Sequence, residues 1–217
     1  MSDTTRNILC FGDSNTHGYD SRTMGRFGVD ERWTMLLADM LGKEYHILEE
    51  GLSGRTAVFD DPLFGGLSGL SVLLPTMMSH EPLDLVVIML GTNDTKARFG
   101  ASAANIASGL RRLTRYALAY TDFYRGGKPN VLLIAPPHID PRYIDTQAAG
   151  DMGEGCAEKS QQLAEWLEPA ARELGVHFLD AQKIPGVEMA PYDWMHLSLE
   201  AHRAFARYLA EYIPTIL

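Results

Sequence analysis

The sequence predicts an α/β protein in which a five-stranded parallel sheet is flanked by helices. Two observations lead to this fold class. Short apolar runs alternate along the chain with longer segments of helical periodicity, the order of strand–helix–strand units joined by right-handed crossovers. One run, residues 85–90 (LVVIML), is apolar at every position, as in a strand that is covered on both faces.

Five apolar runs are the predicted strands. The first, ILCF, begins at Ile8, and the last, VHFLD, begins at Val176. The run LVVIML is also rich in β-branched residues, which favours a strand over a short buried helix. The predicted strands are residues 8–11, 45–48, 85–90, 131–136 and 176–180.

Four segments carry apolar side chains at the three-to-four-residue spacing of an amphipathic helix. Gly42 is the expected stop of the first, and Ser198 the expected N-cap of the last. Two other stretches, 60–71 and 136–155, are rich in Gly, Pro and Asp and are predicted as loops at a functional rim or a subunit contact. The predicted helices are residues 32–42, 105–120, 156–174 and 198–213.

The composition indicates one globular domain over residues 1–217. Hydrophobic residues make up 46%, and no repeat or low-complexity linker divides the chain. The net charge of −9 argues against a nucleic-acid partner. The two cysteines, Cys10 and Cys156, lack metal-ligand spacing, and Cys10 is expected to be a buried free thiol. With no signal peptide and no apolar run near the roughly 20 residues of a membrane span, we expect a cytoplasmic protein without a membrane partner.

Polar residues follow four of the five predicted strands. In parallel sheets, ligands bind beyond the carboxyl ends of the strands, near the point where the strand order reverses. Residues that follow different strands are therefore expected to meet at one edge of the sheet. The segments concerned are 12–15 (GDSN), 50–55 (EGLSGR), 91–94 (GTND) and 193–198 (DWMHLS).

These segments contain the parts that acyl transfer at a serine requires. Ser14 falls at a strand-to-helix turn, which projects its hydroxyl and its backbone N–H. His196 is the candidate base, and Asp193, three residues earlier, suits the fixing of the imidazole tautomer. Gly54 has no side chain to keep its N–H from an ester carbonyl, and the Asn93 amide is a second oxyanion donor. Ser14 alone would suit a helix cap, but the full set favours a nucleophile.

In their order along the chain, these residues resemble the sequence blocks of the SGNH, or GDSL-type, hydrolases. The stretches ILCFGDS, EEGLSGRT and IMLGTNDTK are similar, more narrowly, to the bacterial arylesterase and acyltransferase (perhydrolase) branch. The resemblance implies a flavodoxin-like three-layer α/β/α sandwich. It also implies a serine esterase that acts on short acyl or aryl esters without a cofactor, transfers acyl groups to alcohols or peroxide, and forms a homo-oligomer. The catalytic residues it implies are Ser14, Asp193 and His196, with Ser14, Gly54 and Asn93 as the oxyanion hole.

Four further residues are expected at the substrate pocket. Asn15 stands where the family name has leucine, at a position that does no catalysis. His17 and Tyr19 fall where the narrower branch often has tryptophan, so the pocket wall differs there in shape and polarity. His138 lies in the irregular stretch that follows the fourth predicted strand.

Three charged residues near the same segments are interpreted as structural. Arg55 follows the glycine turn and either meets a substrate carboxylate or pairs with Asp60 or Asp61, and the structural pair is favoured. Asp13 and Asp94 are expected to make hydrogen bonds within their own turns.

Two other functions are open to the sequence alone. A flavodoxin-like signalling module with Asp13 as phosphoryl acceptor leaves the pair of Asp193 and His196 without a role. A metal-dependent phosphoesterase has the oxygen and imidazole ligands it needs, but no Asp-x-His pair occurs before Gly12. We expect a site for a small-molecule ester that holds no metal. The candidate ligands of the phosphoesterase alternative are Asp13, Asn93, Asp94, His138, Asp193 and His196.

Overall fold

The computed structural model describes residues 5–217, and it confirms the predicted α/β fold class. In this part of the chain, five strands form one sheet in which every neighbouring pair is parallel. The spatial order is β4-β1-β5-β6-β7. All the predicted strands are present, as β1 (Arg6–Gly12), β4 (Tyr45–Gly51), β5 (Leu85–Met89), β6 (Val131–Ala135) and β7 (His177–Asp180).

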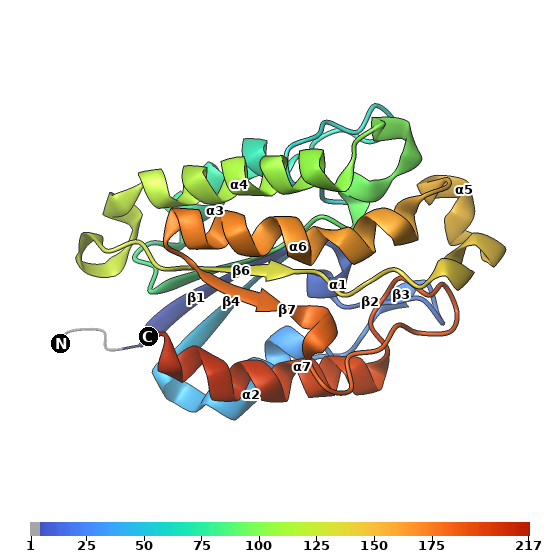
Figure 1. Ribbon diagram of the computed structural model, residues 1–217. Coiled ribbons are helices and arrows are strands. Elements are labelled where there is room, and N and C mark those ends of the chain that lie inside the picture. The colour runs from blue at the N-terminus through green and yellow to red at the C-terminus, as the bar shows by residue number, and fades with distance from the viewer. Residues whose placement is uncertain (1–4) are drawn as a thin grey trace.

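Helices cover both faces of the sheet and give the three layers seen in Figure 1. On one face α2 (Trp33–Leu41) packs against α7 (Leu199–Tyr212). The other face is covered by α3 (Gly69–His80), α4 (Ala103–Ala119) and α6 (Cys156–Leu174). This arrangement is the flavodoxin-like three-layer sandwich that the family resemblance implies.

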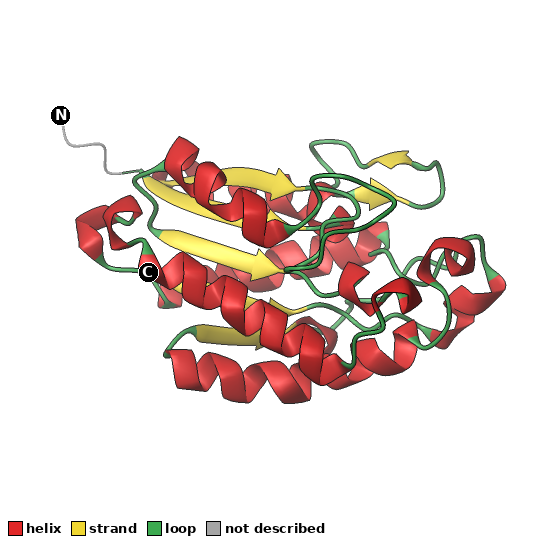
Figure 2. Cartoon of the chain, turned by 90° about the horizontal axis from the view of Figure 1, so that it is seen from above, coloured by secondary structure: helices red, strands yellow, loops and turns green. Residues whose placement is uncertain are grey.

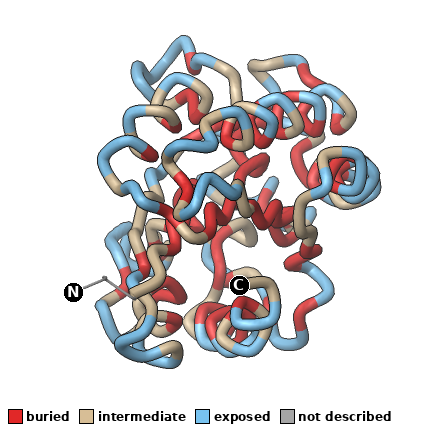
Figure 3. Tube along the Cα trace, turned by 90° about the vertical axis from the view of Figure 1, so that its left-hand side faces the viewer, coloured by how far each residue is buried: buried red, intermediate tan, exposed pale blue. Residues whose placement is uncertain are grey.

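The alternation of side chains along β5 explains why its sequence is apolar throughout. Leu85, Val87 and Met89 pack into the core beneath α2 and α7, whereas Val86 and Ile88 pack beneath α3, α4 and α6. All five side chains are almost completely buried, and burial of each contributes roughly 1.5–3 kcal/mol. Figure 3 shows buried residues gathered along the middle of the molecule, with exposed ones on the outer sides of the helices.

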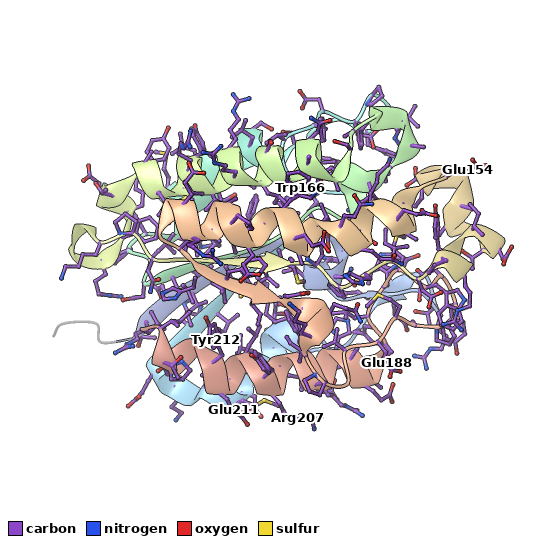
Figure 4. The ribbon with its side chains drawn as sticks, viewed as in Figure 1. Glu154, Trp166, Glu188, Arg207, Glu211 and Tyr212 are labelled. Carbon is purple, nitrogen blue, oxygen red and sulfur yellow. The ribbon has the colours of Figure 1, made fainter. Side chains whose placement is uncertain are left out.

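The helix ends follow local sequence signals. The hydroxyl of Ser198 accepts the backbone N–H of Ala201 at 3.0 Å, so it is the N-cap of α7 as predicted. Gly42, with a φ of +73°, follows the last residue of α2. Figure 4 shows Arg207 and Glu211 on the side of α7 that faces away from the sheet, and both are exposed. The polar stripe of this helix therefore faces solvent.

Helix α5 (Ala148–Met152) lies inside the predicted loop 136–155, and two further features were not predicted. The predicted loop 60–71 overlaps the start of α3, a helix hidden by Pro75 in its interior, where proline removes a backbone hydrogen bond. Burial of Leu73 and Met77, one turn apart, compensates for that loss. The second feature is a hairpin of β2 (Tyr19–Asp20) and β3 (Gly25–Arg26), whose strands are too short to show alternation.

The strand order places a switch point at β1, because the chain passes from β1 to the edge strand β4 and returns to β5 on the other side of β1. In Figures 1 and 2 the strand arrowheads point to one end of the molecule. The short helices α1 (Ser14–His17) and α5 (Ala148–Met152) and the β2–β3 hairpin lie at that end. None of the helices in residues 5–217 has both the length and the apolar character required to span a bilayer.

Candidate active site

Ser14 is the first residue of α1, at the carboxyl end of β1. The Oδ1 of Asp13 accepts the N–H of Asn15 at 3.0 Å and caps this short helix, which confirms the predicted structural role of Asp13. A Cβ added at Gly12 would lie 2.0 Å from the Thr16 hydroxyl oxygen, so only glycine lets α1 fold back this closely on the strand. The tight turn leaves Ser14 6% exposed at the sheet edge.

The side chains of Ser14, His196 and Asp193 form a continuous chain of hydrogen bonds. The Nε2 of His196 lies 2.8 Å from the Oγ of Ser14, and its Nδ1 lies 2.5 Å from the Oδ2 of Asp193. The other carboxylate oxygen of Asp193 accepts the N–H groups of Met195 and His196, both at 3.1 Å. Trp194, which lies between Asp193 and Met195 in the sequence, has a φ of +58°, and this left-handed residue closes the turn.

The environment of Asp193 favours its ionised form. Burial acts to raise the pKa of this carboxyl group, but the hydrogen bond from the His196 ring and the two backbone N–H donors outweigh it, so the pKa is lowered. A carboxylate can only accept, so the proton of the imidazole lies on Nδ1. Nε2 then carries the lone pair that faces the hydroxyl of Ser14.

Gly54 and Asn93, the residues expected to supply oxyanion donors, line the same cavity as Ser14. Gly54, Asn93, Ser14 and His196 all line one cavity of about 790 Å³. Gly54 has a φ of +85°, a conformation that suits glycine, and a Cβ there would lie 2.9 Å from the Cδ1 of Leu67. The Nδ2 of Asn93 donates to the backbone carbonyl of Arg55 at 3.2 Å, which fixes the orientation of the amide. The cavity thus brings together the three residues whose N–H groups are the predicted oxyanion donors.

Most of the rest of the cavity wall comes from four parts of the chain: the β2–β3 hairpin, the loop that holds Phe64, the 145–152 segment and the loop that holds Tyr192. Tyr19 lines it, as expected, and its ring lies 4.5 Å, centroid to centroid, from the imidazole of His196. Met24, Phe64 and Tyr192 line it while remaining more than half exposed, so they form its outer part. Residues of the 145–152 segment complete the wall: Asp145, Thr146, Gln147, Ala148, Asp151 and Met152.

Three residues expected at the pocket do not line the cavity. Asn15 is one residue along α1 from Ser14, about 100° around the helix, and its side chain bonds to the segment around His196 instead. His17 ends α1, where its backbone lies against Gly51 at the end of β4. The backbone N–H of His138 donates to the Oε1 of Gln182, a residue that follows β7, at 2.9 Å.

Arg55 has a structural environment, but its predicted partners were wrong. Its Nη1 donates to the carbonyls of Gly12, at 3.0 Å, and Glu50, and so ties together the ends of β1 and β4. Asp61 instead lies 2.9 Å from the Nη2 of Arg98, which approaches from the segment after β5. Asp61 is near Arg55 along the chain, but the fold brings Arg98, not Arg55, into contact with Asp61.

Two carboxyl groups lie buried behind the site. Both oxygens of Asp94 accept the N–H of Ala57, at 2.9 and 3.0 Å, so Asp94 makes structural hydrogen bonds as predicted, although to another segment. Burial, together with the nearby charge of Asp13, raises the pKa of Asp94 to about 7. Burial likewise raises the pKa of Asp13 to about 6, against the hydrogen bond from Asn15.

The candidate metal ligands do not gather into a ligand set. Within residues 5–217, no group of three or more His, Cys, Asp or Glu side chains is arranged so that it could hold a metal ion. The phosphoesterase alternative requires such a cluster, so it lacks support from the donor side chains.

The buried Cys10 is a free thiol, as predicted.

Comparisons with known proteins identify the family of this chain. The sequence model of the GDSL-like lipase/acylhydrolase family matches residues 10–204. The solved native aryl esterase of M. smegmatis is 35% identical, with a TM-score of 0.88 over 98% of this chain and 100% of that one. Est24, a carbohydrate acetylesterase from Sinorhizobium meliloti, has the same identity, coverage and TM-score.

A second Sinorhizobium meliloti structure, of a carbohydrate acetylesterase family member, is 32% identical, with a TM-score of 0.87 over 98% of this chain and 99% of that one. No curated protein matches the chain. The family model covers most of the sequence, and these similar structures exceed 30% identity over nearly the whole of both chains. This protein therefore belongs to the GDSL-like lipase/acylhydrolase family, the group of esterases that its sequence resembles.

Proposed function

We propose that this protein is a serine esterase that hydrolyses short-chain acyl esters, including acetyl and aryl esters, through an acyl-enzyme. The observation that carries the proposal is the hydrogen-bonded chain from Ser14 through His196 to Asp193 on the wall of a cavity. The similarity to an aryl esterase and to carbohydrate acetylesterases supports the same class of substrate.

Acylation begins when the Oγ of Ser14 attacks the ester carbonyl carbon. The hydroxyl proton passes to the Nε2 of His196, which lies 2.8 Å away and carries the lone pair. Asp193 stays ionised and stabilises the imidazolium that forms. The proton then goes to the oxygen of the leaving alcohol as the bond between that oxygen and the acyl carbon breaks.

The negative charge on the carbonyl oxygen is met by N–H donors. The backbone N–H groups of Ser14 and Gly54 and the Nδ2 of Asn93 are the proposed donors, because all three residues line the cavity beside the nucleophile. Each such donor supplies about 3 kcal/mol of transition-state stabilisation in a site that excludes water.

Deacylation repeats the sequence with water as the nucleophile. His196 takes a proton from water, the hydroxide adds to the acyl carbon, and the proton returns to the Oγ of Ser14 as the acid leaves. An alcohol or a peroxide that enters the cavity competes with water and yields a new ester or a peracid. The apolar rings of Tyr19 and Phe64 in the wall support this competition, because they lower the local concentration of water.

The intact mass of the protein before and after an organophosphorus ester tests the proposal. The wild type is expected to gain one adduct, and Ser14→Ala none, because only an activated serine reacts. Ser53→Ala is the matched control, since Ser53 lines the same cavity but has no imidazole partner proposed for it. This control should be labelled like the wild type. A wild type that folds but gains no adduct would falsify the serine mechanism.

The hydrolysis of 4-nitrophenyl acetate separates this proposal from the phosphoesterase alternative. Turnover is expected to be unaffected by a chelator, whereas a metal-dependent phosphoesterase would cleave the matching phosphate ester and lose activity with the chelator.

The homo-oligomer that the resemblance implies stays a prediction, and light scattering of the wild type would measure its mass in solution.

A further inference from the structure

The side chain of Asn15 holds the backbone on both sides of His196. Its Oδ1 accepts the N–H of Leu197 at 2.9 Å, and its Nδ2 donates to the carbonyl of Met195 at 3.4 Å. These two residues flank His196 in the sequence, about 180 positions away from Asn15. One amide group therefore spans the short segment that presents the imidazole.

Asn15 is itself fixed relative to Ser14, its neighbour in the chain. Its N–H donates to the Oδ1 of Asp13 at 3.0 Å, and its carbonyl accepts the indole N–H of Trp33 at 3.0 Å. Trp33 is fully buried, and its own backbone N–H donates to the Nδ1 of His202 at 3.2 Å. Asn15 is only 3% exposed, so its amide has little freedom to turn away.

The pairing requires both a donor and an acceptor at this position. A carboxylate would accept from Leu197 but has no proton for the Met195 carbonyl, and a leucine can bond to neither. Leu197 is 1% exposed, so loss of its acceptor leaves a buried N–H unsatisfied. Asparagine can therefore make both hydrogen bonds at this position, whereas the leucine of the family name can make neither.

The segment has other anchors that do not depend on Asn15. The N–H of Ala190 donates to the carbonyl of His196 at 2.7 Å, and the N–H of Asp140 donates to the carbonyl of Trp194 at 2.9 Å. Loss of the Asn15 amide therefore leaves the segment folded. What it removes is the link that joins the backbone of the segment carrying the base to the turn carrying the nucleophile, besides the hydrogen bond between His196 and Ser14 themselves.

We propose that Asn15 is a positioning residue for the reaction, which keeps the Nε2 of His196 in line with the Oγ of Ser14. The inference rests on the proposed function, in which His196 takes the proton of Ser14. Asn15 touches neither the substrate nor the reacting atoms, and acts through the backbone of Met195 and Leu197. Substitution should therefore lower the rate of the chemical step and leave substrate binding nearly unchanged.

The test compares Asn15→Leu with Asn130→Leu. The control removes an asparagine whose Nδ2 donates to the carbonyl of Ile216 at 2.9 Å, at the opposite end of the sheet. For Asn15→Leu we expect kcat on 4-nitrophenyl acetate to fall about 10- to 100-fold, the effect of misplacing a reacting group by about 1 Å. KM should change no more than in the control. The variant should stay folded, with a midpoint of thermal unfolding lower than that of the control because the buried N–H of Leu197 loses its acceptor.

Two measurements separate positioning from general damage to the fold. The rate of labelling of Ser14 by the organophosphorus ester should fall by the same factor as kcat. The far-downfield proton resonance of the Nδ1–H, expected for the 2.5 Å bond to Asp193, should shift or broaden in Asn15→Leu and stay unchanged in Asn130→Leu. If Asn15→Leu does not fold, Asn15→Asp, which keeps the acceptor for Leu197, should show a smaller change in the same direction.

The outcomes distinguish this inference from the proposed function. A wild type that is not labelled at Ser14 overturns the proposed function and the inference with it. A labelled wild type, with an Asn15 variant that reacts at the same rate, overturns the inference alone. Slower labelling with an unchanged proton resonance also overturns it, because the imidazole would then be held as in the wild type.

Discussion

The Nδ1 of His196 and the Oδ2 of Asp193 lie 2.5 Å apart, within a turn closed by the same carboxylate. The two groups are three residues apart, so the orientation of the base is set locally. The hydroxyl of Ser14, in contrast, reaches this pair from a residue 182 positions earlier. The base and its orienting group therefore form one unit, and the nucleophile is brought to it by the fold.

Asp193→Asn is predicted to lower kcat by about 10⁴-fold while the protein stays folded. An amide at residue 193 can donate its NH₂ to the Nδ1 of His196, which puts the imidazole proton on Nε2. That nitrogen then has no lone pair for the hydroxyl of Ser14. Steady-state hydrolysis of 4-nitrophenyl acetate measures the loss.

Asp39→Asn, an exposed substitution on α2, is the control for that variant and should retain wild-type kcat. An Asp193→Asn protein with full activity would show that the carboxylate does not set the tautomer.

Asn93→Ala is predicted to lower kcat by about 10²- to 10³-fold, as expected for loss of one oxyanion donor. KM should change little, because the amide is proposed to bond the oxyanion more strongly than the ester carbonyl. The variant should still be labelled at Ser14, only more slowly, since the bonds from His196 to Ser14 and Asp193 are intact. Unchanged kcat would remove Asn93 from the oxyanion hole.

Asp151→Asn is predicted to weaken substrate binding. Asp151 accepts from the Nζ of Lys96 and from the Nη2 of Arg98, both at 2.8 Å, and so ties the 145–152 segment of the cavity wall to the segment after β5. Burial acts to raise the pKa of Asp151, but these two cations outweigh it and lower the pKa. Without the charge the wall loosens, so KM should rise several-fold while kcat stays within about twofold.

Glu168→Gln is the control for Asp151→Asn, because it removes a surface ion pair with Arg172 on α6, away from the cavity lining. Equal KM values for Asp151→Asn and the wild type would mean that the ion pairs do not shape the wall.

His202 is predicted to make the protein less stable as the pH falls. Burial, with a smaller contribution from the nearby His196, lowers the pKa of this imidazole to about 3. The unfolded chain binds the proton near pH 6.5, so between pH 6.5 and 3 it holds more protons at this residue than the folded chain. Stability from this group is therefore present above pH 6.5 and declines on acidification, by about 1.4 kcal/mol per pH unit.

The free energy of unfolding in urea at pH 7 and at pH 4.5, for the wild type and His202→Gln, measures this effect. The wild type should lose more stability than the variant over this interval. Asp13 and Asp94, whose pKa values are raised to about 6 and about 7, act in the opposite direction in both proteins, so the comparison cancels them. Equal losses in the two proteins would contradict the prediction.

The sequence by itself determined the class of fold and singled out the residues that are proposed to react. The apolar runs and the helical periodicities are local patterns, and they located all the strands of the sheet and the helices α2, α4, α6 and α7. The pair of Asp193 and His196 is also local, since one turn holds both side chains. A proline in its interior was enough to hide α3, because proline is a strong local signal against a helix.

Only the tertiary structure decided which distant groups meet. The strand order brings the turn after β1 against the segment before α7, and so brings the hydroxyl of Ser14 to the imidazole of His196. The same contact places the side chain of Asn15 against the backbone of Met195 and Leu197 rather than in the pocket where the sequence predicts it. Contacts of this kind depend on how crossovers stack whole strands and helices, and no spacing along the chain encodes that distance.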